Sequence, residues 1–203
     1  MVVRLNIASN GLCKTPAVGM ECAEALYNLF FRTQHLAYLN LSWNHIRWEM
    51  GARILEGLED NLSLIEIDLA YNLLGERKGG DTPAAQIGVM LIRNDTLKHL
   101  DISYNMIDSK AIFCIANAFK SNNTLESIIV NGNPIGHAGQ RYLMQAINRN
   151  NSFNNVEMKQ VSSGINPAEK GMFDPNSPEA MYKIDMESVY DRVILQNLLD
   201  IDE

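Results

Sequence analysis

Asparagine and aromatic side chains recur together along this sequence, each after a short apolar segment. The asparagines are Asn10, Asn44, Asn72, Asn105 and Asn133, and the residues directly before three of them are Trp43, Tyr71 and Tyr104. An asparagine side chain both donates and accepts hydrogen bonds, so an aligned row could bind a ligand or satisfy backbone groups that have lost contact with water. Aromatic residues beside polar ones are typical of protein-binding surfaces. The choice between these roles depends on the elements that position the residues.

Other kinds of chemistry have little support in the sequence. Three cysteines, Cys13, Cys22 and Cys114, form no Cys-x-x-Cys motif, and the four histidines are scattered. This pattern favours free, buried thiols in a reducing compartment over a metal site. No spaced His/Asp/Ser set and no pocket-like acid pair is present, so we expect a protein that is not an enzyme and needs no cofactor.

The composition limits the classes of partner. The chain has 203 residues, 46% hydrophobic and 20% charged, with a formal net charge of -7. That size and composition fit one globular domain with a substantial core. The negative charge disfavours nucleic acid as the main partner, because phosphate binding needs clustered lysine and arginine. No apolar run reaches the roughly 20 residues of a membrane span, and the start has no apolar signal segment. We therefore expect an intracellular, cytoplasmic protein that does not bind membranes.

Six segments fit one template, with apolar residues at positions one, four and six and asparagine at position nine. The segments start at residues 2, 36, 64, 97, 125 and 153, so successive starts differ by 34, 28, 33, 28 and 28 residues. In the sixth segment Val161 replaces the asparagine. Between the segments, apolar residues recur four apart, as Leu26 and Phe30 or Ile54 and Leu58 do, which indicates one face of a helix. Each unit is thus predicted to be a short strand, a turn and a helix of about three turns.

This pattern resembles the leucine-rich repeat, with helices like those of the ribonuclease-inhibitor-like class. The resemblance covers about residues 2–161 and implies an α/β, right-handed, horseshoe-shaped solenoid with a parallel sheet on the concave face and helices on the convex face. Such units bury their apolar sides only by stacking. The predicted organisation is an array of about six units over 1–161 and a tail over 162–203. In this family the asparagine is structural, so Asn10, Asn44, Asn72, Asn105 and Asn133 are expected to form one buried ladder. Each asparagine would satisfy the turn of its own unit and the backbone of the next.

The strand positions left over by the core are predicted to lie on the concave face. We call residues that share a template position a column. Aromatic residues of the eighth column should lie about 4.8 Å apart on adjacent strands, and with Tyr38 they would make an aromatic strip beside the acidic pair Asp68 and Asp101. They could bind a partner or simply pack on one another. The candidate protein-binding residues are Tyr38, Asn40, Trp43, Glu66, Asp68, Tyr71, His99, Asp101 and Tyr104.

A rim arginine supports a second hypothesis. Ran GTPase-activating proteins share this fold class, and an arginine on a repeat loop has been invoked for such roles. Arg47 and Arg77 lie just past the asparagine of their units. Arg77 belongs to the insertion Gly75–Asp81, which is expected to be an exposed loop and lacks the spacing of a phosphate-binding loop. The alternative function is therefore regulation of a small GTPase.

The first and last units of the array each have one apolar side that no further unit of this sequence covers. Val2, Leu5 and Ile7 have no earlier unit to cover them, so either the array continues before Met1 or a partner covers it. In the tail, Phe173, Tyr182 and Ile184 could cap the last unit or dock on a partner. A further stretch, 189–201, is predicted to form a short amphipathic helix.

Two short stretches suggest a cellular setting. The segments "FDPNSPEAMYKIDM" (173–186) and "LSWNHIR" (41–47) resemble parts of cilium-associated leucine-rich-repeat proteins of protists. That resemblance implies an axonemal or cytoskeletal location, in a cilium or flagellum. The resulting hypothesis is a non-catalytic scaffold that binds an unidentified protein, within a larger cytoskeletal assembly, through the concave sheet face.

Overall fold

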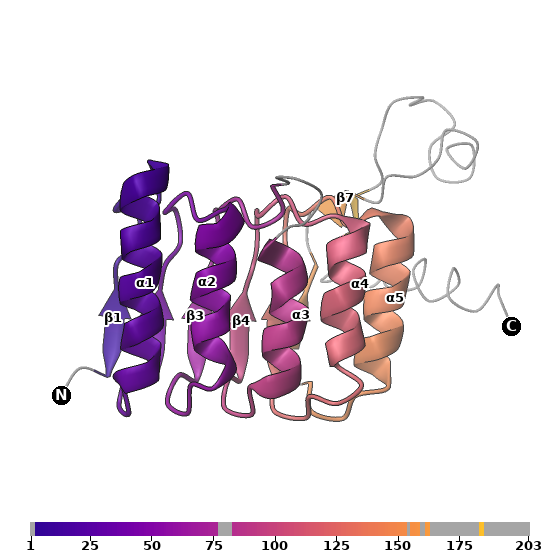
Figure 1. The fold of residues 1–203 in the computed structure, drawn as a ribbon. Helices are drawn as coiled ribbons and strands as arrows, with labels where there is room; N and C mark the ends of the chain where they lie inside the picture. The colour runs from indigo at the N-terminus through magenta and orange to yellow at the C-terminus, as the bar shows by residue number, and fades with distance from the viewer. Residues whose placement is uncertain (1–2, 77–82, 154, 159–160, 163–182, 185–203) are drawn as a thin grey trace, which may run out of the picture.

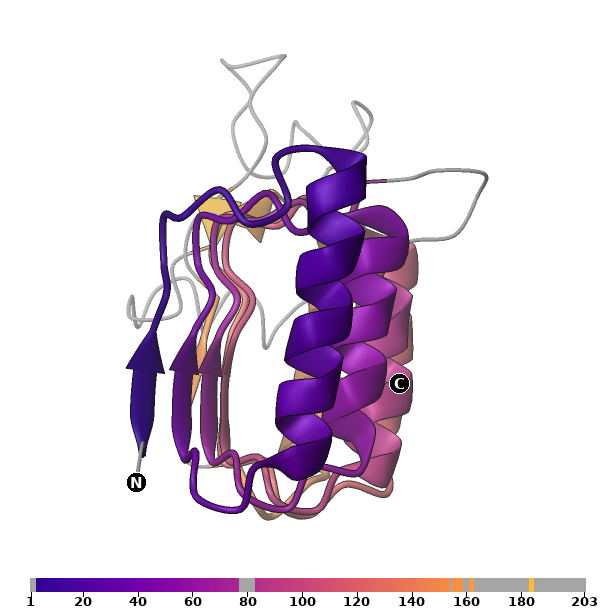
Figure 2. The ribbon, with the colours of Figure 1, turned by 60° about the vertical axis from the view of Figure 1, so that its left-hand side comes forward.

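The computed structural model describes residues 3–76, 83–153, 155–158, 161–162 and 183–184. Strands and helices alternate and form two layers, a sheet and a row of helices (Figures 1 and 2). The elements are β1 (Arg4–Asn6), α1 (Pro16–Arg32), β2 (Tyr38–Asn40), α2 (Trp48–Glu59), β3 (Glu66–Asp68), α3 (Pro83–Arg93), β4 (His99–Asp101), α4 (Ser109–Ala118), β5 (Ser127–Ile129), α5 (Gly136–Asn148) and β6 (Asn155–Glu157).

The main sheet has six parallel strands in chain order, β1-β2-β3-β4-β5-β6. Each strand pairs with the next so that equal template positions stand opposite each other, as in Leu39 opposite Ile67 and Ile67 opposite Leu100. One helix connects each strand of this sheet to the next, as a parallel pair requires a crossover connection. The predicted α/β solenoid of strand–helix units is confirmed, and equal template positions form continuous columns across the sheet.

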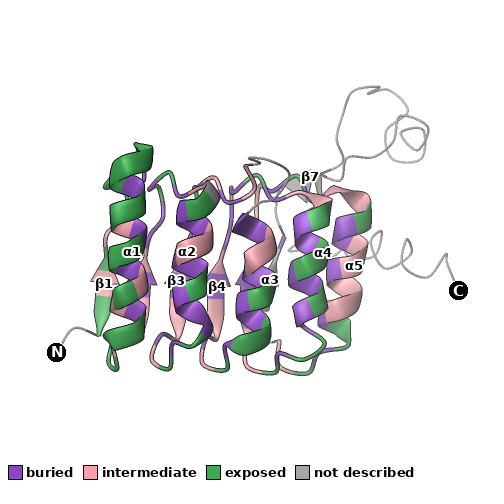
Figure 3. Cartoon of the chain, in the orientation of Figure 1, coloured by how far each residue is buried: buried purple, intermediate pink, exposed green. Residues whose placement is uncertain are grey.

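The core lies between the two layers, at the predicted positions. Leu39, Leu41 and Ile46 from the strand and turn of the second unit are fully buried, as are Ile54 and Leu58 from α2. Figure 3 shows buried residues along every helix, with exposed residues on the outer side of α1 to α4 and mostly half-buried ones on α5. Because every unit repeats this arrangement, the stacked units share one continuous core. Among the described residues, no helix is long and apolar enough to cross a membrane.

The asparagine ladder exists, but each buried asparagine side chain contacts the preceding unit and not, as was predicted, the next one. Asn44 Oδ1 accepts hydrogen bonds from the backbone N–H groups of Asn10 (3.0 Å) and Leu12 (3.3 Å), which belong to the preceding unit. Its Nδ2 donates to the carbonyls of Ile7 and Leu41. Each buried asparagine thus bonds carbonyls of its own unit, which confirms that part of the prediction, and also the backbone of the unit before it. The buried members are Asn44, Asn72, Asn105 and Asn133.

Asn10 was predicted to be a buried member of this ladder, and it is exposed. Strand β1 has a neighbour on only one side among the described residues. The Asn10 side chain donates one hydrogen bond, to the carbonyl of Ala8 in its own turn. Among the described residues, the hydrogen bond of the Asn10 side chain thus stays within its own unit.

A second asparagine ladder, which the sequence analysis missed, runs along the opposite edge of the array. It lies where each helix returns to the sheet. Asn94 Nδ2 donates to the carbonyls of Leu58 (2.7 Å) and Asn61 (3.2 Å), and its Oδ1 accepts from the N–H groups of Thr96 (2.9 Å) and Leu97 (2.7 Å). The members of this ladder are Asn61, Asn94, Asn122 and Asn150, all buried. Thus buried asparagine side chains join neighbouring units along both edges of the solenoid.

The sixth repeat ends differently from the others. Val161, placed by the repeat at the asparagine position, begins β7 (Val161–Ser162), which pairs antiparallel with β8 (Lys183–Ile184). Ile184, a predicted capping residue, stands opposite Val161 in this small sheet. Phe173 and Tyr182, and the predicted helix over 189–201, lie outside the described residues.

The three cysteines are free thiols, as predicted, but they are not all buried. Cys13 is buried, Cys22 is half-buried and Cys114 is exposed. Cys114 lies on α4, and its outward position follows from the neighbouring buried residues Ile112, Ile115 and Ala116, which occupy the inner face of that helix. Burial raises the pKa of the Cys13 thiol to about 12, which keeps it protonated.

Candidate protein-binding site

Three aromatic side chains stack across the end of the sheet, and each is the third residue after its strand. The rings of Trp43 and Tyr71 have centroids 4.0 Å apart and lie 11° from parallel. Those of Tyr71 and Tyr104 are 4.3 Å apart and 10° from parallel. Both distances are shorter than the strand spacing of about 4.8 Å, so the rings are in direct contact. We call Trp43, Tyr71 and Tyr104 the aromatic row.

The backbone holds the aromatic row in the left-handed conformation. The φ angles of Trp43, Tyr71 and Tyr104 are 60°, 54° and 53°. This region costs a non-glycine residue about 1–2 kcal/mol. The column therefore favours glycine, which occupies it at Gly132 with a φ of 65°. Conformational preference does not explain why three large aromatic residues stand here.

Gly132 forms one end of the aromatic row. A Cβ atom added at Gly132 would collide with the ring of Tyr104. The Tyr104 ring therefore lies on the Gly132 backbone, where no side chain fits. At the opposite end the exposure rises, and Trp43 is 53% exposed against 38% for Tyr71. The row is thus closed at the Tyr104 end and open at the Trp43 end.

The hydroxyl group of Tyr71 lies near Tyr104 and near the acidic side chain of Asp101. Partial burial, the proximity of Tyr104, a hydrogen bond between the two hydroxyls and the charge of Asp101 together raise the pKa of Tyr71. The row therefore combines apolar ring faces with a polar, acceptor-rich side. That combination matches the aromatic anchors and polar rim of protein interfaces.

The acidic pair beside the row has a structural role that the sequence analysis missed. The backbone N–H of Ala70 donates to Asp68 Oδ1 (2.9 Å), and the N–H of Ser103 donates to Asp101 Oδ1 (2.8 Å). Asn40 accepts from Ser42 N–H in the same way. These contacts are Asx turns, in which a side chain accepts a hydrogen bond from the backbone two residues on. The sequence signal for these turns was an aspartate or asparagine at the fifth template position, two residues before the N–H group that it accepts from.

Burial is also the first cause of a raised pKa at Asp68. The charge of Asp101 acts in the same direction, while hydrogen bonds from Ala70, Ser42 and Asn40 oppose it. Two carboxylates on adjacent strands therefore concentrate negative charge beside the aromatic row, and each has one oxygen committed to its own turn.

The third column lies on the same sheet face but does not extend the aromatic row. Tyr38, Glu66 and His99 stand opposite one another on β2, β3 and β4, and all are half-buried. Tyr38 was predicted to join the aromatic strip. Instead the guanidinium of Arg4 lies 4.0 Å from the centre of its ring. Tyr38 belongs to a different column from the row, so strand register keeps it apart.

The rim arginines differ in what the structure shows of them. Arg47 lies 3.6 Å from Glu76 in an ion pair at the rim. Arg77 and most of the insertion Gly75–Asp81 lie outside the described residues. Within the described part of the chain, no cluster of three or more His, Cys, Asp or Glu residues is placed to hold a metal ion.

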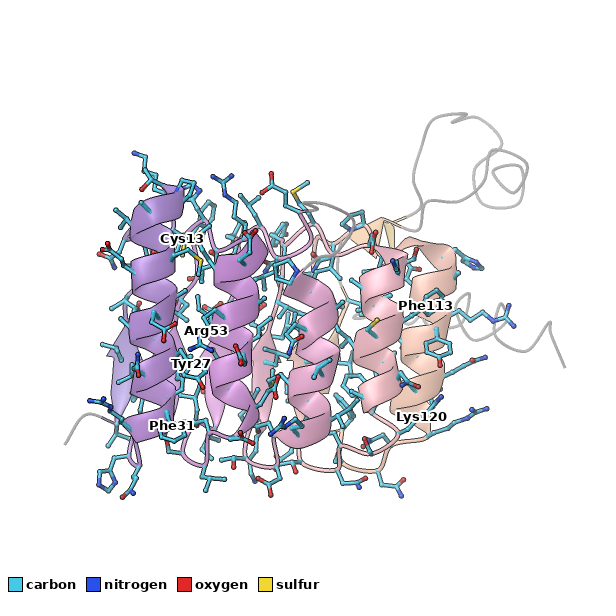
Figure 4. The ribbon with its side chains drawn as sticks, viewed as in Figure 1. Cys13, Tyr27, Phe31, Arg53, Phe113 and Lys120 are labelled. Atoms are coloured by element: carbon cyan, nitrogen blue, oxygen red, sulfur yellow. The ribbon has the colours of Figure 1, made fainter. Side chains whose placement is uncertain are left out.

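The helix face carries a charged hollow that the sequence analysis did not identify. Arg53 bonds Glu24 (2.8 Å) and Glu56 (2.8 Å), and its guanidinium lies 3.4 Å from the centre of the Tyr27 ring (Figure 4). A shallow space of about 460 Å³ lies beside it, lined also by Glu59 and Gln86. Glu59 pairs with Arg93 and with Gln86. These charged groups satisfy one another, so the hollow is explained by contacts between units.

Comparison with known proteins supports this assignment of the fold. Residues 33–47 and 93–116 match the family model described as Leucine Rich repeat. These segments contain β2 and β4 together with the ladder residues Asn44 and Asn105. The protein folds as a leucine-rich-repeat solenoid. No curated protein matches the sequence.

Solved leucine-rich-repeat-like structures share this arrangement. The structure titled leiomodin-1 actin-binding site 2 has a TM-score of 0.55 at 19% identity and covers 92% of this chain and 90% of its own. The tropomodulin C-terminal domain of Caenorhabditis elegans has a TM-score of 0.54 at 14% identity, covering 73% and 83%. A leucine-rich repeat-containing protein of Legionella pneumophila has a TM-score of 0.50 at 20% identity, covering 85% of this chain and 52% of its own. At these identities the likeness establishes the fold alone.

Proposed function

We propose that this leucine-rich-repeat solenoid is a non-catalytic scaffold that binds a protein partner through its sheet face. The aromatic row carries the proposal. Three large rings stand at positions whose backbone favours glycine, and the ring of Trp43 keeps about half of its surface in water (53% exposed). Aromatic residues of this kind supply much of the binding energy in protein interfaces.

The residues expected to form the binding face comprise the aromatic row and its polar border. Glu66 and His99 lie on the sheet strands, and Asp68 and Asp101 lie at the strand ends beside the row. Because Asp68 and Asp101 also accept hydrogen bonds within their own turns, their contribution to binding is the negative charge that they place beside the row. The row supplies apolar contact area, and the border supplies negative charge.

We propose a cytoskeletal partner, in keeping with the resemblance of residues 41–47 and 173–186 to cilium-associated proteins. One neighbour in fold is titled an actin-binding site, which makes actin the first partner to test. The ciliary or flagellar location is a proposal from the sequence. Localisation of a tagged chain in a ciliated source cell tests it, and a uniform cytoplasmic signal would contradict it.

The alternative, regulation of a small GTPase, needs a rim arginine that can reach a bound nucleotide. Arg47 is paired with Glu76, so this alternative places more weight on Arg77. An Arg77→Ala variant that kept partner binding but lost stimulation of GTP hydrolysis would favour the alternative. An unchanged rate of hydrolysis would remove it.

Affinity capture from the source cell tests the main proposal. The intact chain is compared with Trp43→Ala/Tyr71→Ala, with the fold of both checked by circular dichroism. A protein recovered by the intact chain and lost with the variant is the expected result. An unchanged set of proteins would move the binding site away from the aromatic row.

A further inference from the structure

Ser9 lies next to Trp43, at the open end of the aromatic row. The N–H of Ser9 donates to the Ser42 carbonyl (2.9 Å), just as the N–H of Trp43 donates to the Ala70 carbonyl (3.1 Å). Ser9 also has the left-handed conformation of the row, with a φ of 58°. It therefore stands beside Trp43 as Trp43 stands beside Tyr71. Serine has no ring, so the stack stops at Trp43, which is 53% exposed.

The first and second units also contain a covered aromatic ring, in the third column. There Arg4 of β1 places its guanidinium 4.0 Å from the centre of the Tyr38 ring on β2. Arg53 and Tyr27 repeat this contact on the helix face, at 3.4 Å. A guanidinium is flat and positively charged, so it stacks on an aromatic face and is attracted by the ring electrons. Among the described residues of the first unit, the structure shows no guanidinium stacked on Trp43 at this end of the row.

We call the open face of Trp43 beside Ser9 the slot, and the charge around it also favours a cation. Asp68 stands two strands from Ser9, so at about 4.8 Å per strand the two residues are at least about 10 Å apart, and Asp101 stands one strand further. The nearer of these distances is comparable to the screening length of about 10 Å at 0.1 M salt. The whole chain has a formal net charge of -7. An arginine at the slot would therefore gain both ring stacking and a longer-range attraction.

We propose that the open face of Trp43, beside Ser9, receives an arginine side chain of the protein partner. This inference rests on the proposed function and names the chemistry by which the sheet face recognises its partner. The Tyr71 ring is covered on one face by Trp43 and on the other by Tyr104. The Tyr104 ring lies between Tyr71 and Gly132. Trp43 is therefore the ring of the row with a face open for stacking.

Short peptides test the slot directly. The full chain carrying Trp48→Phe has Trp43 as its single tryptophan, and the fluorescence of Trp43 reports binding. The probes are capped tri-arginine, tri-lysine, tri-citrulline and tri-tyrosine, titrated at low and at physiological salt. Citrulline keeps the flat shape of arginine without its charge. We expect tri-arginine to bind about two- to fivefold more tightly than tri-lysine, and tri-citrulline to bind more weakly than both.

Two variants of Ser9 provide the matched controls. Ser9→Tyr places a ring over Trp43 in a backbone conformation that Tyr71 and Tyr104 already adopt, so it should fill the slot and remove the preference for arginine over lysine. Ser9→Ala leaves the slot open and should keep the preference. Equal affinity for arginine and lysine peptides, tighter binding of tri-tyrosine, or no effect of Ser9→Tyr would each overturn the proposal.

This test separates the slot from the proposed function. If the arginine preference is absent while Trp43→Ala/Tyr71→Ala still loses a captured partner, the sheet face binds its partner by other chemistry. If the double variant also keeps every partner, the proposed function fails as well.

Discussion

Replacing Asn72 by alanine should destabilise the solenoid strongly, because this side chain serves two units. Asn72 Oδ1 accepts from the N–H groups of Asn44 (3.0 Å) and Ile46 (3.0 Å), both buried. Its Nδ2 donates to the carbonyls of Leu41 and Leu69. Those carbonyls keep a second donor in the variant, from the neighbouring ladder residues. The two N–H groups have no such second partner at the ladder.

The expected cost follows from the two N–H groups alone. A buried donor left without its partner costs about 1–3 kcal/mol, so Asn72→Ala should lose about 2–6 kcal/mol of unfolding free energy. This is a large part of the total stability of a typical domain, about 5–15 kcal/mol. The matched control is Asn10→Ala, which removes one exposed hydrogen bond to Ala8 and should cost about 1 kcal/mol or less.

Urea unfolding followed by circular dichroism measures both variants. The midpoint of Asn72→Ala should fall well below that of the parent chain, with a similar dependence on urea concentration. The midpoint of Asn10→Ala should stay close to the parent value. If the two variants differed by less than about 1 kcal/mol, the buried ladder would not hold the units together as described.

Further predictions concern the second ladder, the thiols and the acidic pair. Asn122→Ala should lose about 2–6 kcal/mol in urea unfolding, because its Oδ1 accepts from two backbone N–H groups, whereas Asn123→Ala, an exposed neighbour, should be nearly silent. A thiol reagent at pH 8 should modify Cys114 first, and Cys13, with a pKa of about 12, only on unfolding; equal rates would contradict the assigned burial. Because the pKa of Asp68 is raised, its contribution to stability is highest in acid and is lost as pH rises through its folded pKa. Asp68→Asn should therefore be more stable than the parent chain at pH 7, with the difference disappearing below the usual aspartate range; a stability difference independent of pH would refute this sign.

The repeat spacing was sufficient to predict the fold, because the same physical requirement recurs in every unit. Leu39, Leu41 and Ile54 are buried where the template placed them. The adjacency of Trp43, Tyr71 and Tyr104 also followed from strand register alone. A column assignment needs no knowledge of side-chain geometry, so this level of detail is accessible from sequence.

Finer contacts were not accessible in the same way. The direction of the Asn44 contact depends on the turn geometry, which the template does not specify. In the sequence, Asn61 and Asn94 each lie three residues before the segment that follows. The template did not include this position, because it started at the first apolar residue of each segment. The Arg4 contact with Tyr38 depends on side-chain rotamers rather than on spacing. Such features require the packed structure.

Direct measurement of partner affinity tests the central claim, that the aromatic row is the protein-binding site. A captured and purified partner is titrated against the intact chain, against Trp43→Ala/Tyr71→Ala and against Phe31→Ala/Ile92→Ala. The last variant removes two exposed apolar side chains from the helix face and controls for a general loss of apolar surface. We expect the row variant to bind at least tenfold more weakly, equivalent to about 1.4 kcal/mol, and the helix-face variant to bind like the intact chain. Unchanged affinity of a folded row variant, or an equal loss in the helix-face variant, would contradict the central claim.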